Sequence, residues 1–148
     1  MNISKIKSGK NVENGEINVI IEIPLHSNIK YELDKDSGAV FIDRFLHTSM
    51  VFPTNYGFVP GTLAEDGDPL DVMVLSDHSV APGTVIPSVV IGMLEMEDEA
   101  GIDTKILAVP SIKIDPLYGV YKDASEIPTA IKNKLKHFYE NYKTLEPG

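Results

Sequence analysis

Three aspartates, Asp66, Asp68 and Asp71, form the strongest chemical signal in the chain. They stand directly before an apolar segment, residues 72–75, which is long enough for a buried strand and too short for a stable helix. Carboxylates at the mouth of an apolar strand lose water and repel one another, and both effects oppose ionisation unless a cation compensates. The spacing therefore predicts a site for a divalent metal ion.

The small residues of this loop indicate how its aspartates could converge. Gly67 permits a backbone turn that a residue with a Cβ resists, while Pro69 fixes its own φ and favours an extended Asp68. Oxygen ligands without cysteine or a neighbouring histidine suit Mg²⁺ or Mn²⁺ better than zinc or copper. An EF-hand is excluded, because Leu70 and Asp71 stand where that loop needs a third ligand and a glycine.

The composition restricts the class of protein. With 148 residues, 43% of them hydrophobic, the chain is expected to form one domain with its own core over residues 1–148. No run approaches the ~20 apolar residues of a membrane span, and the N-terminal segment lacks the apolar core of a secretory signal. The absence of cysteine excludes disulfides, and a net charge of −9 argues against nucleic-acid binding. We therefore expect a cytoplasmic protein that binds neither membranes nor nucleic acids.

The hydrophobic patterns predict a mainly β protein with one helix. Strands are expected at residues 17–24, in a hairpin of residues 29–33 and 39–46, and at residues 72–75, 84–96 and 106–110. Residues 111–124 are expected to form a loop. A helix should follow the N-cap candidate Ser125, because apolar residues recur there with helical spacing. These residues are Ile131, Leu135, Phe138 and Tyr142.

Several charged residues fall inside the predicted strands, and each has an ordinary structural explanation when taken alone. Glu22 could face solvent from the first strand, and the guanidinium of Arg44 could reach the surface past its apolar neighbours. Residues two apart share one face of a strand. This spacing pairs Lys30 with Glu32 and Asp103 with Lys105.

Taken together, these residues resemble the bacterial family I soluble inorganic pyrophosphatases. The resemblance extends from about residue 8 to the last residue and depends most on the aspartate loop, which is far more specific than a lone D-x-D. It is also carried by Glu22, Lys30, Glu32 and residues 43–44, 55–57, 98–105 and 137–143. It implies a small closed OB-like β-barrel with one long C-terminal helix packed on it, and usually a homohexamer. Chains of the family usually continue past the position of Gly148, so this chain is expected to be short of the family's C-terminal segment.

The resemblance further implies Mg²⁺-dependent hydrolysis of pyrophosphate, with Mn²⁺ or Zn²⁺ as substitutes, and a role for each site residue. Asp66, Asp71 and Asp103 would hold the first metal ion, with Asp71 bridging to a second, and Asp68 would accept a proton from the attacking water. Ions arriving with the substrate would be held by Glu22, Glu32, Asp98 and Asp103, with Glu99 and Lys105 nearby. Lys30 and Tyr56 would contact the phosphoryl group under attack, and Arg44, Tyr142 and Lys143 the leaving phosphate.

This many carboxylates would let so acidic a chain bind an acidic substrate, because divalent ions held by them attract pyrophosphate as a metal complex. Two ions about 3.5–4 Å apart can lower the pKa of a shared water and orient it for in-line attack. Positioning and electrostatics supply most of the catalysis of phosphoryl transfer. Three alternatives stay open: a metal-dependent phosphohydrolase for nucleotides or phosphodiesters, an OB-like binding module with structural Ca²⁺, and a folded but inactive form.

Overall fold

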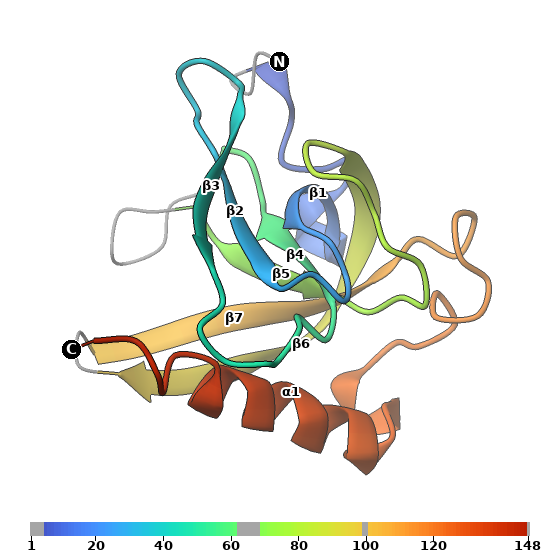
Figure 1. The fold of residues 1–148 in the computed structure, drawn as a ribbon. Coiled ribbons are helices and arrows are strands. Elements are labelled where there is room, and N and C mark those ends of the chain that lie inside the picture. Colours follow the sequence, from blue (N-terminus) through green and yellow to red (C-terminus); the bar gives the residue numbers. More distant parts are fainter. Residues whose placement is uncertain (1–4, 62–68, 99–100, 148) are drawn as a thin grey trace.

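The computed structural model of the protein consists of a closed β-barrel, a two-stranded hairpin and one α-helix (Figure 1). It describes residues 5–61, 69–98 and 101–147, without the side chains of residues 97, 98 and 101. The barrel strands are β1 (Glu16–Ile23), β4 (Asn55–Phe58), β5 (Asp71–Val74), β6 (Val85–Asp98) and β7 (Gly101–Pro110). The remaining elements are the hairpin strands β2 (Ile29–Leu33) and β3 (Val40–Phe45), the 3-10 turns η2 (Val12–Asn14) and η3 (Ala124–Glu126), and the helix α1 (Thr129–Asn141).

The barrel strands follow the order β1–β4–β5–β7–β6, and β6 pairs with β1 to close the ring. Neighbouring strands are antiparallel except for β5 and β7, which run parallel. A small closed ring of five strands is typical of OB-like barrels. The predicted fold class, mainly β with a closed barrel and one long C-terminal helix, is therefore confirmed.

Strand β1 is buried on both faces, which explains its run of β-branched residues. Val19 packs with Val72 of β5 in a core cluster drawn from the barrel strands, while Ile20 packs with Leu33 of the hairpin. Because β1 contacts the other barrel strands on one side and the hairpin on the other, it fixes where β2 and β3 lie relative to the barrel.

Two β-bulges place acidic residues where regular strand alternation does not. The register between β1 and β4 skips Glu22, and the register between β2 and β3 skips Asp43. A bulge bends its strand and turns a side chain out of the alternating pattern. The two-residue alternation of a regular strand therefore could not predict which way the side chain of Glu22 points. It also could not predict how Asp43 lies relative to Arg44.

The helix α1 lies along β6 and β7 (Figure 1) and buries the face that the helical spacing predicts. Leu135, Phe138 and Tyr139 are buried, and the ring centre of Phe138 lies 4.8 Å from that of Phe52. In the part of the chain that the structure describes, no helix is both long and apolar enough to cross a membrane.

The start of the helix differs from the prediction. Ser125 lies within η3, whose N-cap is Asp123, so the prediction that Ser125 caps the helix was wrong. Pro128 disfavours a helical conformation for the residue before it, and Ile127 is extended with a ψ of 133°. The helix begins only after the proline.

The strands also differ from the prediction at three places. β5 begins at Asp71, β7 begins at Gly101 rather than at residue 106, and β4 was not predicted at all. The segment of β4 has few apolar residues, and its Gly57 serves close packing rather than a turn. A Cβ on Gly57 would lie 1.9 Å from the backbone oxygen of Ile20, so β1 and β4 can pair this closely only around a glycine.

Candidate active site

A cleft formed by the barrel, the hairpin and the end of α1 gathers most of the predicted site residues. It comprises a hollow of about 260 Å³ and an adjoining hollow of about 390 Å³, which share Lys30, Tyr56 and Asp71. The first hollow is also lined by Asp103, Lys105, Tyr142 and Lys143, and the second by Glu22, Glu32 and Arg44. Residues from six strands and from the turn after the helix therefore meet in one place.

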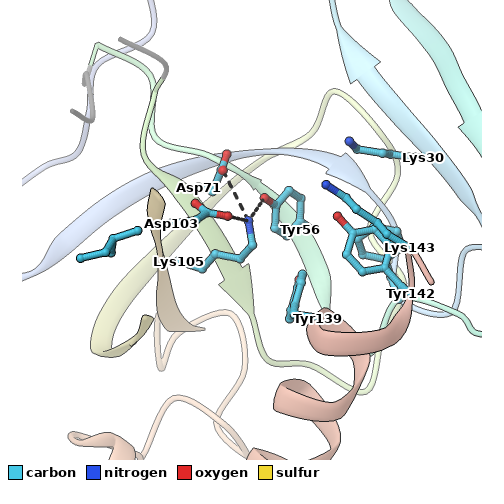
Figure 2. Close-up of a pocket in the computed structure, with 10 residues that line it drawn as sticks. Lys30, Tyr56, Asp71, Asp103, Lys105, Tyr139, Tyr142 and Lys143 are labelled. Atoms are coloured by element: carbon cyan, nitrogen blue, oxygen red, sulfur yellow. Dashed lines mark hydrogen bonds and ion pairs between the residues drawn. The ribbon is translucent and has the colours of Figure 1, made fainter. Parts of the chain in front are cut away.

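Lys105 lies at the centre of the first hollow and is only 5% exposed (Figure 2). Its Nζ donates a 2.8 Å hydrogen bond to the hydroxyl of Tyr56 and lies 3.2 Å from Asp103 Oδ2 and 3.6 Å from Asp71 Oδ2. The ammonium group also lies 5.0 Å and 5.4 Å from the ring centres of Tyr56 and Tyr139. These contacts give a buried cation the compensation that it requires.

The strand register explains this convergence. β5 and β7 are parallel neighbours, and Val72 lies opposite Ile106. Asp71 and Lys105 each precede a residue of this pair, so they also lie beside each other. Asp103 is two residues before Lys105 and shares its strand face, as the sequence predicts. A carboxylate from each of two strands is thus directed at one ammonium group.

Glu22 enters the second hollow from its bulge in β1. Its Oε2 accepts a 2.9 Å hydrogen bond from the backbone N–H of Leu33, which ties the barrel to the hairpin. Burial raises the pKa of Glu22 to about 7, against the opposing effect of that hydrogen bond and with a smaller contribution from the charge of Asp71. A cation bound next to Glu22 would stabilise its ionised form and offset the effect of burial.

Arg44 and Lys30 form the basic part of the cleft on the hairpin. Arg44 Nη1 donates to Asp43 Oδ2, and the same oxygen lies 3.6 Å from Lys30 Nζ. Burial lowers the pKa of Lys30, and the neighbouring charge of Arg44 lowers it further. A second carboxylate, that of Glu146, accepts a 3.0 Å hydrogen bond from Arg44 Nε.

Tyr142 and Lys143 reach the cleft from the turn that follows α1. Figure 2 shows the hydroxyl of Tyr142 and the amino groups of Lys30 and Lys143 on the same side of the cleft. Burial raises the pKa of Tyr142 above its usual value, and burial together with the charge of Asp71 raises that of Tyr56 well above it. Both phenols therefore stay protonated near neutral pH and can donate hydrogen bonds to an anion.

Some residues of the cleft were not predicted from the sequence. Tyr139 and Phe52 line the first hollow, Asp43 lines the second, and Glu146 contacts Arg44. The spacing of Tyr139 from Tyr142, one helical turn, was the available signal for one of them. Glu146 and Arg44 are 102 residues apart, so the sequence contained no signal of their contact.

Four of the predicted site residues cannot be placed in the cleft. Asp66, Asp68 and Glu99 lie outside the described residues. Asp98 is the last residue of β6, but the structure describes only its backbone and not its side chain. Of the three aspartates that motivated the metal prediction, Asp71 alone is among the described residues.

The donor chemistry of the cleft fits a hard divalent cation. Glu22, Glu32, Asp71 and Asp103 offer only carboxylate oxygens, which suit Mg²⁺ and similar ions. Asp71 and Asp103 already lie near one positively charged atom, Lys105 Nζ. Burial opposes the ionisation of Glu22, and a bound cation would offset that effect. Among residues 5–61, 69–98 and 101–147, however, no three acidic or histidine side chains lie close enough together to hold a metal ion.

The fold and the cleft define a class of small β-barrel proteins in which carboxylates and cations face one surface cleft. A family model described as inorganic pyrophosphatase matches residues 19–148. The chain belongs to the inorganic pyrophosphatase family.

Individual relatives agree with this assignment. An inorganic pyrophosphatase of Aquifex pyrophilus is 55% identical over 148 residues, which cover 100% of this chain and 83% of that protein. One from Aeropyrum pernix is 59% identical over 132 residues, covering 89% of this chain and 75% of that protein. The solved structure of an inorganic pyrophosphatase from Coxiella burnetii is similar with a TM-score of 0.90 at 47% identity, covering 96% of this chain and 84% of that one.

Proposed function

We propose that this protein hydrolyses inorganic pyrophosphate to two phosphates by in-line attack of a water molecule, with Mg²⁺ as its cofactor. The observation that carries the proposal is the single cleft in which Asp71, Asp103 and Glu22 face the same space as Lys30 and Arg44. Carboxylates alone would repel a pyrophosphate, and cations alone would not hold a metal ion. A metal complex of pyrophosphate needs both.

The metal-binding role is proposed for the carboxylates of the cleft and of the aspartate loop, namely Glu22, Glu32, Asp66, Asp71, Asp98 and Asp103. When bound, the ions would supply Lewis-acid activation of the attacking water and charge compensation for the substrate. Asp68 is proposed to take the proton from that water as general base. Glu99 and Lys105 are proposed to support this group, and the ion pairs of Lys105 with Asp71 and Asp103 favour that role.

The phosphate-binding role is proposed for the basic and phenolic residues of the cleft. Lys30 and Tyr56, which line both hollows, would contact the phosphoryl group under attack. Arg44, Tyr142 and Lys143 would bind the leaving phosphate, since donors placed in advance stabilise charge that develops on its oxygens. The plane of the Arg44 guanidinium can present two N–H groups to one phosphate, which a lysine cannot.

The cellular setting is also part of the proposal. The family resemblance favours a homohexamer, the lack of cysteine favours the reducing cytoplasm, and the net charge of −9 disfavours nucleic acids as partners. We propose that residues 1–148 form one domain, in line with the shared clusters of buried residues that link the barrel to α1. A sizing column in the presence of Mg²⁺ tests the oligomer directly.

The function is tested by measuring phosphate release from pyrophosphate with Mg²⁺ and with excess EDTA. We expect rapid release with Mg²⁺ and none with EDTA, and at least ~100-fold lower kcat/KM for ATP and for a phosphodiester, because the described residues of the cleft include no group dedicated to a base or sugar. Comparable rates on ATP would favour a nucleotide phosphohydrolase. Release from none of these substrates, in a folded protein that still binds a divalent ion such as Ca²⁺, would favour a binding module.

A further inference from the structure

Glu146, which follows α1 in the chain, contacts Arg44 of the hairpin strand β3. Arg44 Nε donates a 3.0 Å hydrogen bond to Glu146 Oε2, and the two residues are 102 apart in the sequence. The side chains are 26% and 17% exposed, so water only partly screens the contact. A charge-assisted hydrogen bond in such surroundings is shorter and more directional than a pair of fully exposed charges.

The backbone after the helix explains how Glu146 reaches this position. Its N–H donates a 2.9 Å hydrogen bond to the carbonyl of Lys143, which keeps the chain turning beyond the end of α1. Tyr142 is anchored in the same turn, because its ring stacks on that of Phe138 at 4.9 Å between centres. The contact of Glu146 with Arg44 therefore joins the hairpin to the turn that carries Tyr142 and Lys143.

A second carboxylate holds the guanidinium from another side. Arg44 Nη1 donates to Asp43 Oδ2, which also lies near Lys30 Nζ. With Nε and Nη1 both engaged, the plane of the guanidinium is fixed. Its Nη2 group has no acceptor among the described residues and stays available to a ligand in the cleft.

We infer that Glu146 is a positioning residue that orients Arg44 for phosphate binding. The inference rests on the proposed function, in which Arg44, Tyr142 and Lys143 bind the leaving phosphate. A free arginine side chain loses much rotamer freedom when it binds, and a partner that fixes it beforehand removes part of that cost. Because Glu146 lies in the turn with Tyr142 and Lys143, the same contact brings the three phosphate-binding residues together.

The charge of Glu146 has an opposite effect that the experiment must separate. A carboxylate near the site repels a phosphate, so its removal alone would strengthen phosphate binding. Glu146→Gln removes the charge and keeps an oxygen that can accept the hydrogen bond from Nε. Glu146→Ala removes both. Positioning therefore predicts a loss in the alanine variant that glutamine restores.

The test measures kcat/KM for Mg²⁺-pyrophosphate in the full chain and in both variants. We expect Glu146→Ala to lower kcat/KM about tenfold or more, since small misplacements of a substrate-binding group have large effects. Glu146→Gln should stay within about threefold of the unmodified chain, given that a neutral acceptor keeps most of the geometry. Glu13→Ala, which removes an exposed carboxylate from η2, is the control and should leave kcat/KM unchanged.

A double-mutant cycle with Arg44→Ala shows whether Glu146 acts through Arg44. If it does, adding Glu146→Ala to Arg44→Ala has little further effect on kcat/KM, whereas independent roles give multiplied losses. Multiplied losses, or an alanine variant as active as the unmodified chain, would overturn the inference while leaving the proposed function intact. An unmodified chain that releases no phosphate would overturn both.

Thermal unfolding of each variant separates loss of the fold from loss of the contact. A partly exposed ion pair contributes little to stability, so all variants should remain folded at the assay temperature. If Glu146→Ala does not fold, Glu146→Asp takes its place. The shorter side chain withdraws the carboxylate from Nε while keeping the charge, and the same loss of kcat/KM is expected.

Discussion

Lys105 donates a 2.8 Å hydrogen bond to the hydroxyl of Tyr56, and the two residues come from β7 and β4, which are not neighbours in the barrel. The strand between them, β5, contributes Asp71 to the same ammonium group. The cleft is therefore organised around a buried cation whose contacts span three strands. Removing that cation should affect both the stability of the barrel and the affinity of the cleft for metal ions.

Replacing Lys105 with methionine removes the charge and keeps most of the volume. We expect the free energy of unfolding, measured with urea at pH 7 in EDTA, to fall by about 1–3 kcal/mol, because two carboxylates lose their counter-charge. The loss is smaller than for a fully buried pair, since the side chains of Asp71 and Asp103 are 36% and 34% exposed.

The exposed Lys134 of α1 provides a control, and Lys134→Met should leave the free energy of unfolding within about 0.5 kcal/mol. Adding Mg²⁺ should restore part of the stability lost in Lys105→Met, because an ion that binds only the folded state stabilises it by mass action. If Mg²⁺ leaves the stability of this variant unchanged, Asp71 and Asp103 are not metal ligands.

Glu22 predicts a dependence of stability on pH. Burial raises its pKa from 4.5 to about 7, so the folded state holds this proton more tightly than the unfolded state. At pH values between these two pKa values, folding is accompanied by the binding of a proton. The contribution of Glu22 to the free energy of unfolding therefore falls as the pH rises. In EDTA at pH 8, Glu22→Gln should therefore be more stable than the unmodified chain, by up to about 3 kcal/mol.

Urea denaturation at several pH values from 4 to 8 measures this effect as the difference between the two proteins. Glutamine keeps an oxygen that can accept the hydrogen bond from Leu33, so the variant changes the charge more than the contacts. Glu13→Gln, at an exposed position in η2, should follow the unmodified chain. A pH dependence that is identical in Glu22→Gln and in the unmodified chain would show that Glu22 keeps its usual pKa.

Most of the fold could be predicted from local patterns, because apolar runs and helical spacing act over a few residues. The buried strand β1, the hairpin and the apolar face of α1 followed from such patterns. β4 could not be predicted in this way, since Tyr56 and Gly57 are placed by pairing with β1 and β5 rather than by their own apolar character. The bulges at Glu22 and Asp43 were beyond prediction for the same reason.

The convergence of the site depended on contacts distant in the sequence. Asp71 meets Lys105 because β5 and β7 are parallel neighbours, and no spacing along the chain shows that pairing. The family resemblance assigned Asp71 and Lys105 to one site but did not indicate that they are in contact. It gave no role to Glu146 or Tyr139, which only the structure shows beside the cleft.

Asp68 is the residue whose proposed role, that of general base, can be tested most sharply, although it lies outside the described residues. Asn has nearly the same shape as Asp but cannot take a proton from water at neutral pH. Asp68→Asn should therefore lower kcat for pyrophosphate by ~10²–10⁴-fold, the usual effect of losing a general base. Calorimetry should find Mg²⁺ binding nearly unchanged in this variant and weakened in Asp71→Asn, which removes a proposed ligand. Turnover close to normal in Asp68→Asn would exclude this residue as the base and move the search to the other carboxylates of the cleft.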